Sequence, residues 1–160
     1  MSYGIGSRCI IRKTKDFNTM VLELSKDAVW QTKKTAWLAG KQTQYGYCTI
    51  GERRKGKPVY VCASWIDAQI AHIVTGAEII CAFSAWNMRD ILSQYVDMVS
   101  TGMIRAVCNR DFNEIAEIEK VSAECQIILP VTKTIKECNF KFERMIYKAE
   151  SLLDSGMIER

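Results

Sequence analysis

The chain has few of the residues from which common catalytic and metal sites are built. His72 is the only histidine, so a histidine-based catalytic triad or a histidine-rich metal site has very little to draw on. No apolar run approaches the roughly 20 residues of a membrane-spanning helix, and the first residues lack the apolar core of a signal peptide. Neither a Gly-x-Gly-x-x-Gly turn nor a Gly-x-Ser-x-Gly turn occurs. We therefore expect no membrane segment, no cofactor and no hydrolase-type nucleophile.

The seven cysteines contain no Cys-x-x-Cys pair, the spacing typical of zinc and redox sites. Four of them lie within or beside short apolar runs: Cys62, Cys81, Cys108 and Cys125. Cysteine behaves as a small apolar residue in such surroundings. The pattern favours buried, reduced thiols in a cytoplasmic protein over a zinc site or a disulfide framework.

The length of 160 residues fits one domain with a single sizeable core. The charge is unevenly distributed along it. Residues 1–60 carry 12 Lys and Arg against 4 Asp and Glu, whereas residues 61–160 carry 10 against 14. A basic first part indicates either a surface that faces a polyanion or an ordinary solvated region rich in lysine.

The middle of the chain begins with the pattern of a βαβ unit. After the apolar run at residues 59–62, one helix face is outlined by Ile66, Ile70, Ile73 and Val74. Ser64 with Asp67 three residues later predicts the start of that helix, and Gly76 predicts its end. The next apolar run, residues 79–83, lacks polar alternation, which is typical of a strand buried on both faces of a parallel sheet.

Strands and helices continue to alternate beyond this unit. Apolar runs at residues 104–108 and 125–129 predict two more strands. The helix before the first of them is expected to start at Asn87 or Asp90 and to end at Gly102. Its apolar face would be formed by Met88, Ile91, Leu92, Tyr95 and Val99.

Two further helices complete the alternation. Asp111 and Glu114 repeat the capping spacing and predict a helix after the third apolar run. A last helix, ended by Gly156, is expected to present Phe142, Met145, Ile146, Ala149, Leu152 and Leu153 on one side. Residues 58–160 are thus predicted to form an α/β core, a mostly parallel four-stranded sheet flanked by helices.

The first part of the chain has the features of short antiparallel strands. Four segments are candidates, separated by polar or glycine-containing turns: residues 8–12, 18–24, 30–37 and 44–50. We expect residues 1–57 to form an antiparallel β extension of the core. The whole chain would then be one domain, residues 1–160.

Five short segments carry a resemblance to a known family: AWLAGK at 36–41, GYCTIG at 46–51, VYVCASW at 59–65, AFSAWNM at 82–88 and VCNRD at 107–111. In this order they resemble the TOPRIM domain of primases and primase-helicases carried by phages and conjugative plasmids. The resemblance implies a TOPRIM-like α/β core. It also implies a site with a Glu after the first strand, as general acid/base, and an Asp-x-Asp pair that holds Mg²⁺.

The chain departs from the family at the residues that would carry this chemistry. Ala63 stands at the place of the Glu, and Ser64 at that of the glycine after it. Asn109, Arg110 and Asp111 occupy the Asp-x-Asp segment, so one carboxylate is lost and a cation follows it. Because Mg²⁺ prefers hard oxygen ligands with negative charge, we expect no metal here and no catalytic residue.

Two acidic residues near this site have a second interpretation. Asp67 matches an aspartate found a few residues beyond the Glu in some primases, but it also has the spacing of a helix cap. Asp111 matches the second Asp of the pair, but it also fits the cap of the following helix.

Three functions remain open from the sequence. The first is a nucleic-acid-binding accessory of replication in a phage or mobile element, which would bind phosphates through Lys33, Lys34, Lys41, Arg53, Arg54, Lys55 and Lys57. The second is a phage or plasmid interaction protein that binds and inhibits a host or defence protein. The third is an active TOPRIM primase or nuclease, for which the missing Glu and Asp would have to come from elsewhere in the chain.

Overall fold

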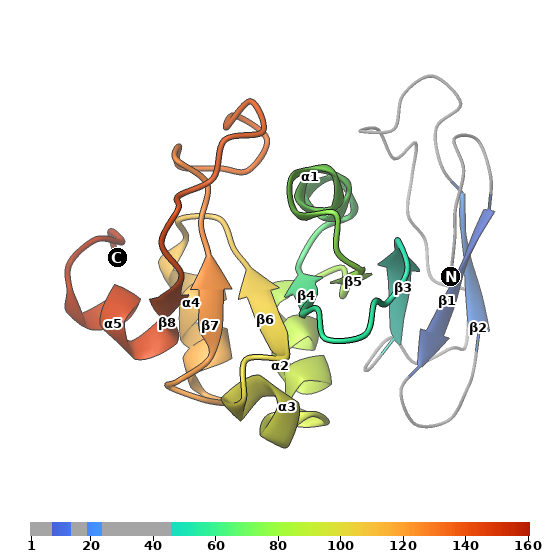
Figure 1. Ribbon diagram of the computed structural model, residues 1–160, viewed down its shortest axis with the longest axis horizontal. Helices are drawn as coiled ribbons and strands as arrows, with labels where there is room; N and C mark the ends of the chain where they lie inside the picture. The colour runs from blue at the N-terminus through green and yellow to red at the C-terminus, as the bar shows by residue number, and fades with distance from the viewer. Residues whose placement is uncertain (1–7, 14–18, 24–45) are drawn as a thin grey trace.

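The computed structural model describes residues 8–13, 19–23 and 46–160 and shows one sheet with helices packed against it (Figure 1). The strands are β1 (Arg8–Lys13), β2 (Thr19–Glu23), β3 (Gly46–Ile50), β4 (Val59–Cys62), β5 (Ile79–Cys81), β6 (Ile104–Val107), β7 (Gln126–Ile128) and β8 (Tyr147–Lys148). The helices are α1 (Trp65–Thr75), α2 (Ala85–Ser93), α3 (Val96–Ser100), α4 (Phe112–Glu119) and α5 (Ala149–Asp154).

The sheet is mixed, with the strand order β2-β1-β3-β5-β4-β6-β7-β8. β4 pairs in parallel with β5 and β6, and β6 pairs in parallel with β7. Antiparallel strands lie on both sides of this group, because β3 pairs with β5 and β8 pairs with β7 in the opposite direction. The α/β class predicted from the alternating pattern is confirmed. The two flanking antiparallel pairings were not predicted.

Two apolar clusters, one on each face of the sheet, form the core. Tyr60 and Cys62 of β4 belong to the cluster that includes α1. Val59 and Val61 belong to the cluster that includes α2, α4 and α5. Successive side chains of a strand point to opposite faces, so a run that is apolar at every position needs cover on both. The helices on the two faces provide that cover (Figure 1).

The predicted starts of α1 and α4 are confirmed. Ser64 is the N-cap of α1, and its side chain accepts a hydrogen bond from the backbone N–H of Asp67 at 3.1 Å. Asp111 is the N-cap of α4, and its carboxylate accepts from the backbone N–H of Glu114 at 3.1 Å. Both bonds satisfy backbone donors that a helix leaves without partners. Gly76, in a left-handed conformation, ends α1 as predicted.

The helix predicted to start at Asn87 or Asp90 differs in its bounds. α2 begins earlier, because Ser84 is its N-cap and accepts from the backbone N–H of Asn87 at 3.0 Å. It also ends earlier, at Ser93, and a separate helix, α3, follows. The interpretation of Asn87 and Asp90 as starting residues was therefore wrong. Both side chains are buried in the first turns of α2.

The last predicted helix was wrong over most of its length. α5 is short. The two residues before it form β8, which runs antiparallel to β7, and Phe142 forms an isolated antiparallel bridge with Pro130. The backbone N–H of Glu143 donates to the carbonyl of Leu129 at 2.8 Å. Apolar residues at helical spacing thus form an extended segment here, because the backbone groups on the edge of β7 need partners.

The first strands pair as antiparallel neighbours. β1 pairs with β2, with Arg8 opposite Glu23, and β1 also pairs with β3, with Lys13 opposite Gly46. The predicted strand at residues 30–37 lies outside the described residues.

The described cysteines are of two kinds. Cys62, Cys81, Cys108, Cys125 and Cys138 are buried free thiols, which confirms the prediction for the first four. Cys48 in β3 is disulfide-bonded. The prediction of reduced thiols therefore does not extend to Cys48.

The parallel strands define two edges of the sheet. We call the side where β4, β5, β6 and β7 end the carboxyl edge, and the side where they begin the amino edge. Residues 130–146 extend beyond the ends of β6 and β7, on the carboxyl edge (Figure 1). The basic loop, residues 51–58, leads into Val59 and therefore lies at the amino edge.

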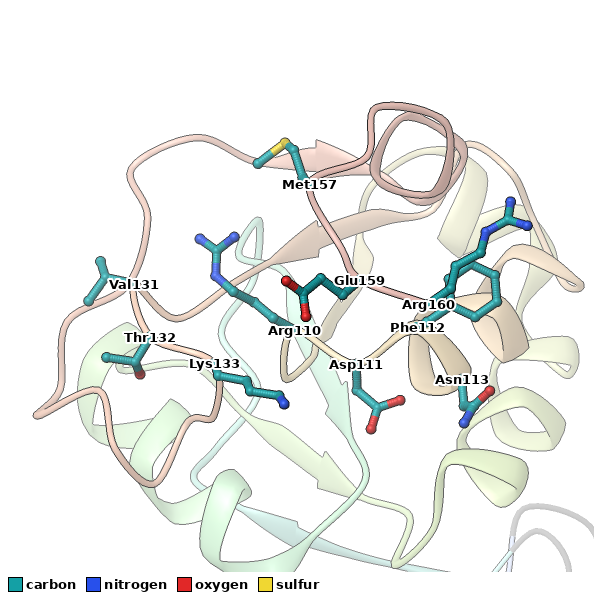
Figure 2. A pocket seen from close by; sticks show the side chains of 10 residues that line it. All are labelled: Arg110, Asp111, Phe112, Asn113, Val131, Thr132, Lys133, Met157, Glu159 and Arg160. Atoms are coloured by element: carbon teal, nitrogen blue, oxygen red, sulfur yellow. The ribbon is translucent and has the colours of Figure 1, made fainter.

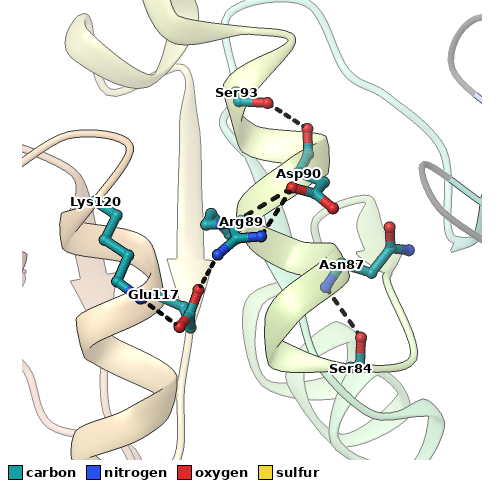
Figure 3. A network of polar contacts seen from close by, with 7 residues as sticks. All are labelled: Ser84, Asn87, Arg89, Asp90, Ser93, Glu117 and Lys120. Atoms are coloured by element: carbon teal, nitrogen blue, oxygen red, sulfur yellow. Dashed lines mark hydrogen bonds and ion pairs between the residues drawn. The ribbon is translucent and has the colours of Figure 1, made fainter.

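An ion-pair network joins α2 to α4 (Figure 3). Arg89 of α2 lies 2.8 Å from a carboxylate oxygen of Glu117 in α4, and the other oxygen of Glu117 lies 2.7 Å from Nζ of Lys120. These groups are partly exposed, so each pair contributes at most about 1 kcal/mol. The network links α2 to α4, which carries residues of the carboxyl edge.

Two glycines of the basic loop provide a test of local packing. Gly51 (φ 82°) and Gly56 (φ 76°) have the same left-handed backbone. A Cβ at Gly51 would lie 2.5 Å from the imidazole ring of His72, which contacts the Ala77 carbonyl at 2.7 Å, whereas a Cβ at Gly56 meets nothing within 4 Å. We expect Gly56→Ala to cost about 1 kcal/mol through backbone strain. Gly51→Ala should cost about 1 kcal/mol more, through the lost His72 hydrogen bond. Equal losses in urea unfolding would contradict this packing.

Candidate functional site

Asn109 lies at the centre of a polar cluster on the carboxyl edge. It follows β6, and its side-chain Nδ2 donates to Oδ2 of Asp67 at 3.0 Å and to Oε2 of Glu114 at 3.3 Å. Its backbone N–H donates to the other oxygen of Glu114 at 3.3 Å. Its side-chain oxygen accepts from the backbone N–H of Ile135 at 2.7 Å. One amide side chain therefore joins α1, α4 and residues 130–146.

Both carboxylates of this cluster are buried. Asp67 is 4% exposed and Glu114 is 7% exposed. Oδ1 of Asp67 is buried and has no hydrogen-bond partner among the described residues. Burial raises the pKa of the Glu114 carboxyl to about 7; the Asp67 and Asp111 carboxylates add to this, and the hydrogen bonds from Asn109 oppose it. Near neutral pH, Glu114 is therefore divided between its protonated and ionised forms.

The thiols next to the cluster are neutral. Burial raises the pKa of Cys62, at the end of β4, well above its usual value, and the pKa of Cys108, directly after β6, is raised by the same cause. A thiol in its neutral form is a poor nucleophile and a poor metal ligand. The chemistry of this edge therefore rests on the carboxylates and the amide.

Asp111 differs from the two buried carboxylates in its exposure and in its hydrogen-bond partner. Its side chain is exposed and caps α4, which is the alternative interpretation of this residue. Arg110 points away from Asp111 (Figure 2). Its guanidinium donates to the Pro130 carbonyl at 3.1 Å and to the Glu143 carboxylate at 2.7 Å. Arg110 thus ties the end of β6 to the segment that follows β7.

The structure brings together the four residues singled out by the resemblance. Ala63, Asp67, Asn109 and Asp111 all lie on the carboxyl edge, and Asp67 and Asn109 are in direct contact. Ala63 supplies no polar side chain. The carboxylate of Asp67 does more than occupy a capping position, because it binds Asn109.

Glu114 is the residue of the cluster that sequence reasoning missed as a site residue. Its position three residues after Asp111 was explained by helix capping alone. A signal was present, since Glu114 lies one helical turn beyond a strand end that carries Asn109 and Asp111. In the described part of the chain, no three His, Cys, Asp or Glu side chains are grouped so that they could hold a metal ion.

The predicted phosphate-binding residues lie elsewhere. Arg53, Arg54, Lys55 and Lys57 are all exposed, on the amino edge. Arg53 lies 3.8 Å from Glu78, the one ion pair of these four cations within the described residues. Lys33, Lys34 and Lys41 lie outside the described residues. The basic loop and the Asn109 cluster are therefore on opposite edges of the sheet.

The basic loop has a spacing that sequence reasoning missed. Gly51, Gly56 and Lys57 match the Gly-x-x-x-x-Gly-Lys part of a phosphate-loop motif, but Pro58 stands where that motif has Ser or Thr. The loop joins β3 to β4, so no helix N-terminus follows it. A phosphate loop needs that helix to direct backbone N–H groups at the ligand. The loop therefore offers exposed cations and not a phosphate cradle.

A cleft of about 750 Å³ opens beside the cluster, between the start of α4, residues 131–133 and residues 157–160 (Figure 2). Its charged residues are of both signs, Arg110, Lys133 and Arg160 with Asp111 and Glu159. The guanidinium of Arg110 is paired with Glu143, and that of Arg160 lies 5.0 Å from the ring of Phe112. The cleft therefore does not extend the basic surface.

The comparisons with known proteins assign no family. No family model, no curated protein and no solved structure matches the chain. In the described part of the chain, no helix is long and apolar enough to cross a membrane.

Asn109→Asp tests the role of the amide. The substitution places a third carboxylate between two buried ones and removes the donor that holds them. We expect a loss of about 3–5 kcal/mol of unfolding free energy at pH 8, as for other buried charges left without a partner. The loss should be smaller at pH 5, where Glu114 is protonated.

Asn113→Asp is the matched control for this substitution. Asn113 is exposed in the first turn of α4, where a carboxylate is favourable. Denaturant unfolding should show a change within about 0.5 kcal/mol for it. A similarly small change for Asn109→Asp would contradict the role of the amide.

Proposed function

We propose that this chain is a catalytically inactive, TOPRIM-like protein that binds nucleic acid, as a cytoplasmic accessory of replication in a phage or mobile element. The observation that carries the binding proposal is the basic loop. Four exposed cations project from this loop: Arg53, Arg54, Lys55 and Lys57. Among the described residues, they form one ion pair, between Arg53 and Glu78 at 3.8 Å. Exposed cations in such density are suited to a phosphate backbone.

The topology supports the TOPRIM-like part of the proposal. The parallel strands lie in the order β5-β4-β6-β7. From β4 the chain adds β5 on one side of the sheet and then β6 and β7 on the other side, so the strand order switches between β4 and β6. Ligands of open α/β sheets bind beyond the carboxyl ends of the strands at such a switch point. Asp67 and Asn109 meet there, in the segments that the resemblance aligns with the family's site.

The contacts of Asn109 support the loss of catalysis. In the family, the corresponding aspartate would bind a cation. Here an amide nitrogen donates to two buried carboxylates and thereby takes the place that a cation would occupy between them. Ala63 offers no general acid or base, and Asp111 is engaged as a helix cap.

Binding to a protein is the second candidate, and one feature favours it. A groove of about 450 Å³ lies between α1 and residues 136–140, lined by Ile66, Ile70 and Phe140. Phe140 is 45% exposed and has a left-handed backbone, a conformation that costs energy in a bulky residue. Strain of this kind is typical of functional surfaces. An inhibitor of a host or defence protein would use such a groove.

The basic loop can be tested by replacing Arg53, Arg54, Lys55 and Lys57 with Gln. Each lost phosphate contact should reduce the slope of log K against log salt by about 0.9 on duplex DNA, and affinity should fall equally for unrelated sequences. Thermal stability should change little, because exposed charges contribute less than about 1 kcal/mol each. Fluorescence anisotropy with short single- and double-stranded DNA measures both quantities.

A matched control removes the same charge from the opposite edge of the sheet. Lys133, Lys136, Lys141 and Arg144 are also exposed, and their replacement with Gln should leave the salt slope nearly unchanged. No binding by the parent protein at low salt, or equal losses in the two variants, would reject the basic loop as the interface. The protein-binding candidate would then lead.

The inactive site predicts the absence of a specific divalent cation. Titration calorimetry with Mg²⁺ or Mn²⁺ should show no saturable site in the micromolar range, because the two buried carboxylates are already bridged by Asn109. A tight site that Asp111→Ala abolishes would instead support an active TOPRIM enzyme.

A further inference from the structure

Residues 131–146 form a long connection without a helix or a strand of its own, located on the carboxyl edge (Figure 1). Segments of this length within a compact domain are uncommon, and they are usually either functional or linkers. Ile135 (0% exposed) and Cys138 (2% exposed) anchor it in the core cluster of α1. The segment therefore covers the edge where open α/β sheets bind ligands.

Three polar contacts hold this segment to the end of β6. The backbone N–H of Ile135 donates to the Asn109 side chain at 2.7 Å, and the backbone N–H of Arg110 donates to the Lys133 carbonyl at 2.9 Å. The Arg110 guanidinium pairs with Glu143 at 2.7 Å. Of the three, the contact nearest the middle of the segment is made by Asn109, which also binds the two buried carboxylates.

Asn109 couples the segment to the carboxylates through the geometry of its amide. The amide nitrogen can only donate hydrogen bonds and the amide oxygen can only accept them. The side chain can therefore bind the two carboxylates and the Ile135 N–H together in one orientation only. Rotation or displacement of Asn109 would break the bond to Ile135 together with those to Asp67 and Glu114. Any event that separates the two carboxylates therefore acts on the segment as well.

Ionisation of Glu114 is such an event, because the titratable groups that face it are acidic or neutral. Asp67 of α1 and Asp111 before α4 are acidic, and the nearby Cys62 and Cys108 are neutral thiols. One helical turn further along α4, Glu117 is paired with Arg89 and Lys120. No cation among the described residues is paired with Glu114. Its ionised form is opposed by burial and by two carboxylates, and the hydrogen bonds from Asn109 offset this only in part, because the pKa remains raised.

We propose that Asp67, Asn109 and Glu114 form a proton-operated latch, which holds residues 131–146 over the carboxyl edge more firmly when Glu114 is protonated than when it is ionised. The latch rests on contacts of the carboxyl edge alone and is independent of the proposed nucleic-acid binding. It makes access to this edge depend on pH around neutrality.

The direction of the pH effect follows from the two states of Glu114. In the closed state its pKa is about 7, whereas in an opened, solvated state it returns to its usual value near 4.5. The closed state therefore holds its proton more tightly, and closure is favoured at low pH. Opening becomes easier as the pH rises from about 4.5 to about 7, and above that range no further change is expected.

Hydrogen exchange of the Ile135 amide measures the latch in the intact chain. The protection factor, corrected for the intrinsic exchange rate, should fall about tenfold between pH 6 and pH 8. The amides of Val61 and Ile127 in the sheet should keep theirs. In Glu114→Gln, which cannot ionise, the protection of Ile135 should no longer depend on pH. Glu119→Gln, on the same helix, should retain the tenfold change.

Two results would overturn the latch. One is the same pH dependence of Ile135 protection in the parent protein and in Glu114→Gln. The other is an equal loss of protection at Val61 and Ile127, which would mean a global loss of stability. If Glu114→Gln does not fold, NMR titration of the parent protein decides: the Glu114 carboxyl carbon and the Ile135 amide should titrate with one midpoint near pH 7. Separate midpoints, or an Ile135 signal that does not move, reject the proposal.

Discussion

The contact on which the carboxyl edge depends is the Asn109 amide between two buried carboxylates. Removing a carboxylate from water is costly unless hydrogen bonds replace the lost hydration. Asn109 supplies these bonds to Asp67 and Glu114, which come from the first turns of two different helices. The same side chain fixes Ile135. One residue therefore contacts α1, α4 and residues 131–146, and a change at Asn109 should affect all three.

Asn109 bridges the two carboxylates without adding a charge of its own. Three carboxylates in so small a space would require a divalent cation to neutralise them, and with that cation the edge could serve catalysis. An amide needs no cation, because it carries its own donors. One oxygen of each carboxylate is thus satisfied by the amide, while Oδ1 of Asp67 has no hydrogen-bond partner among the described residues. With a neutral amide at this position, the cluster contains two buried carboxylates, of which Glu114 has a raised pKa.

What could be predicted from the sequence was local. The caps Ser64 and Asp111 were predictable because each bonds to a backbone N–H three residues away. The contact of Asp67 with Asn109 spans 42 positions in sequence, and no spacing rule reaches that far. Glu114 already had a sufficient local explanation as a capping residue, which concealed its second role. The final helix was predicted too long because residues 142–148 have a helical apolar pattern. In the structure Phe142 bridges Pro130 and residues 147–148 pair with β7, and tertiary pairing overrides such a pattern.

The two candidate functional regions are separated by the length of the parallel strands. β4 runs between them, and four residues of strand span roughly 13 Å. The causes of the pKa shift of Glu114 are burial and its neighbours Asn109, Asp67 and Asp111, and the cations of the basic loop are not among them. A polyanion bound at the amino edge and a proton bound at the carboxyl edge should act independently, unless the sheet itself is distorted. Because the strands between them are buried on both faces and tightly packed, such distortion is costly.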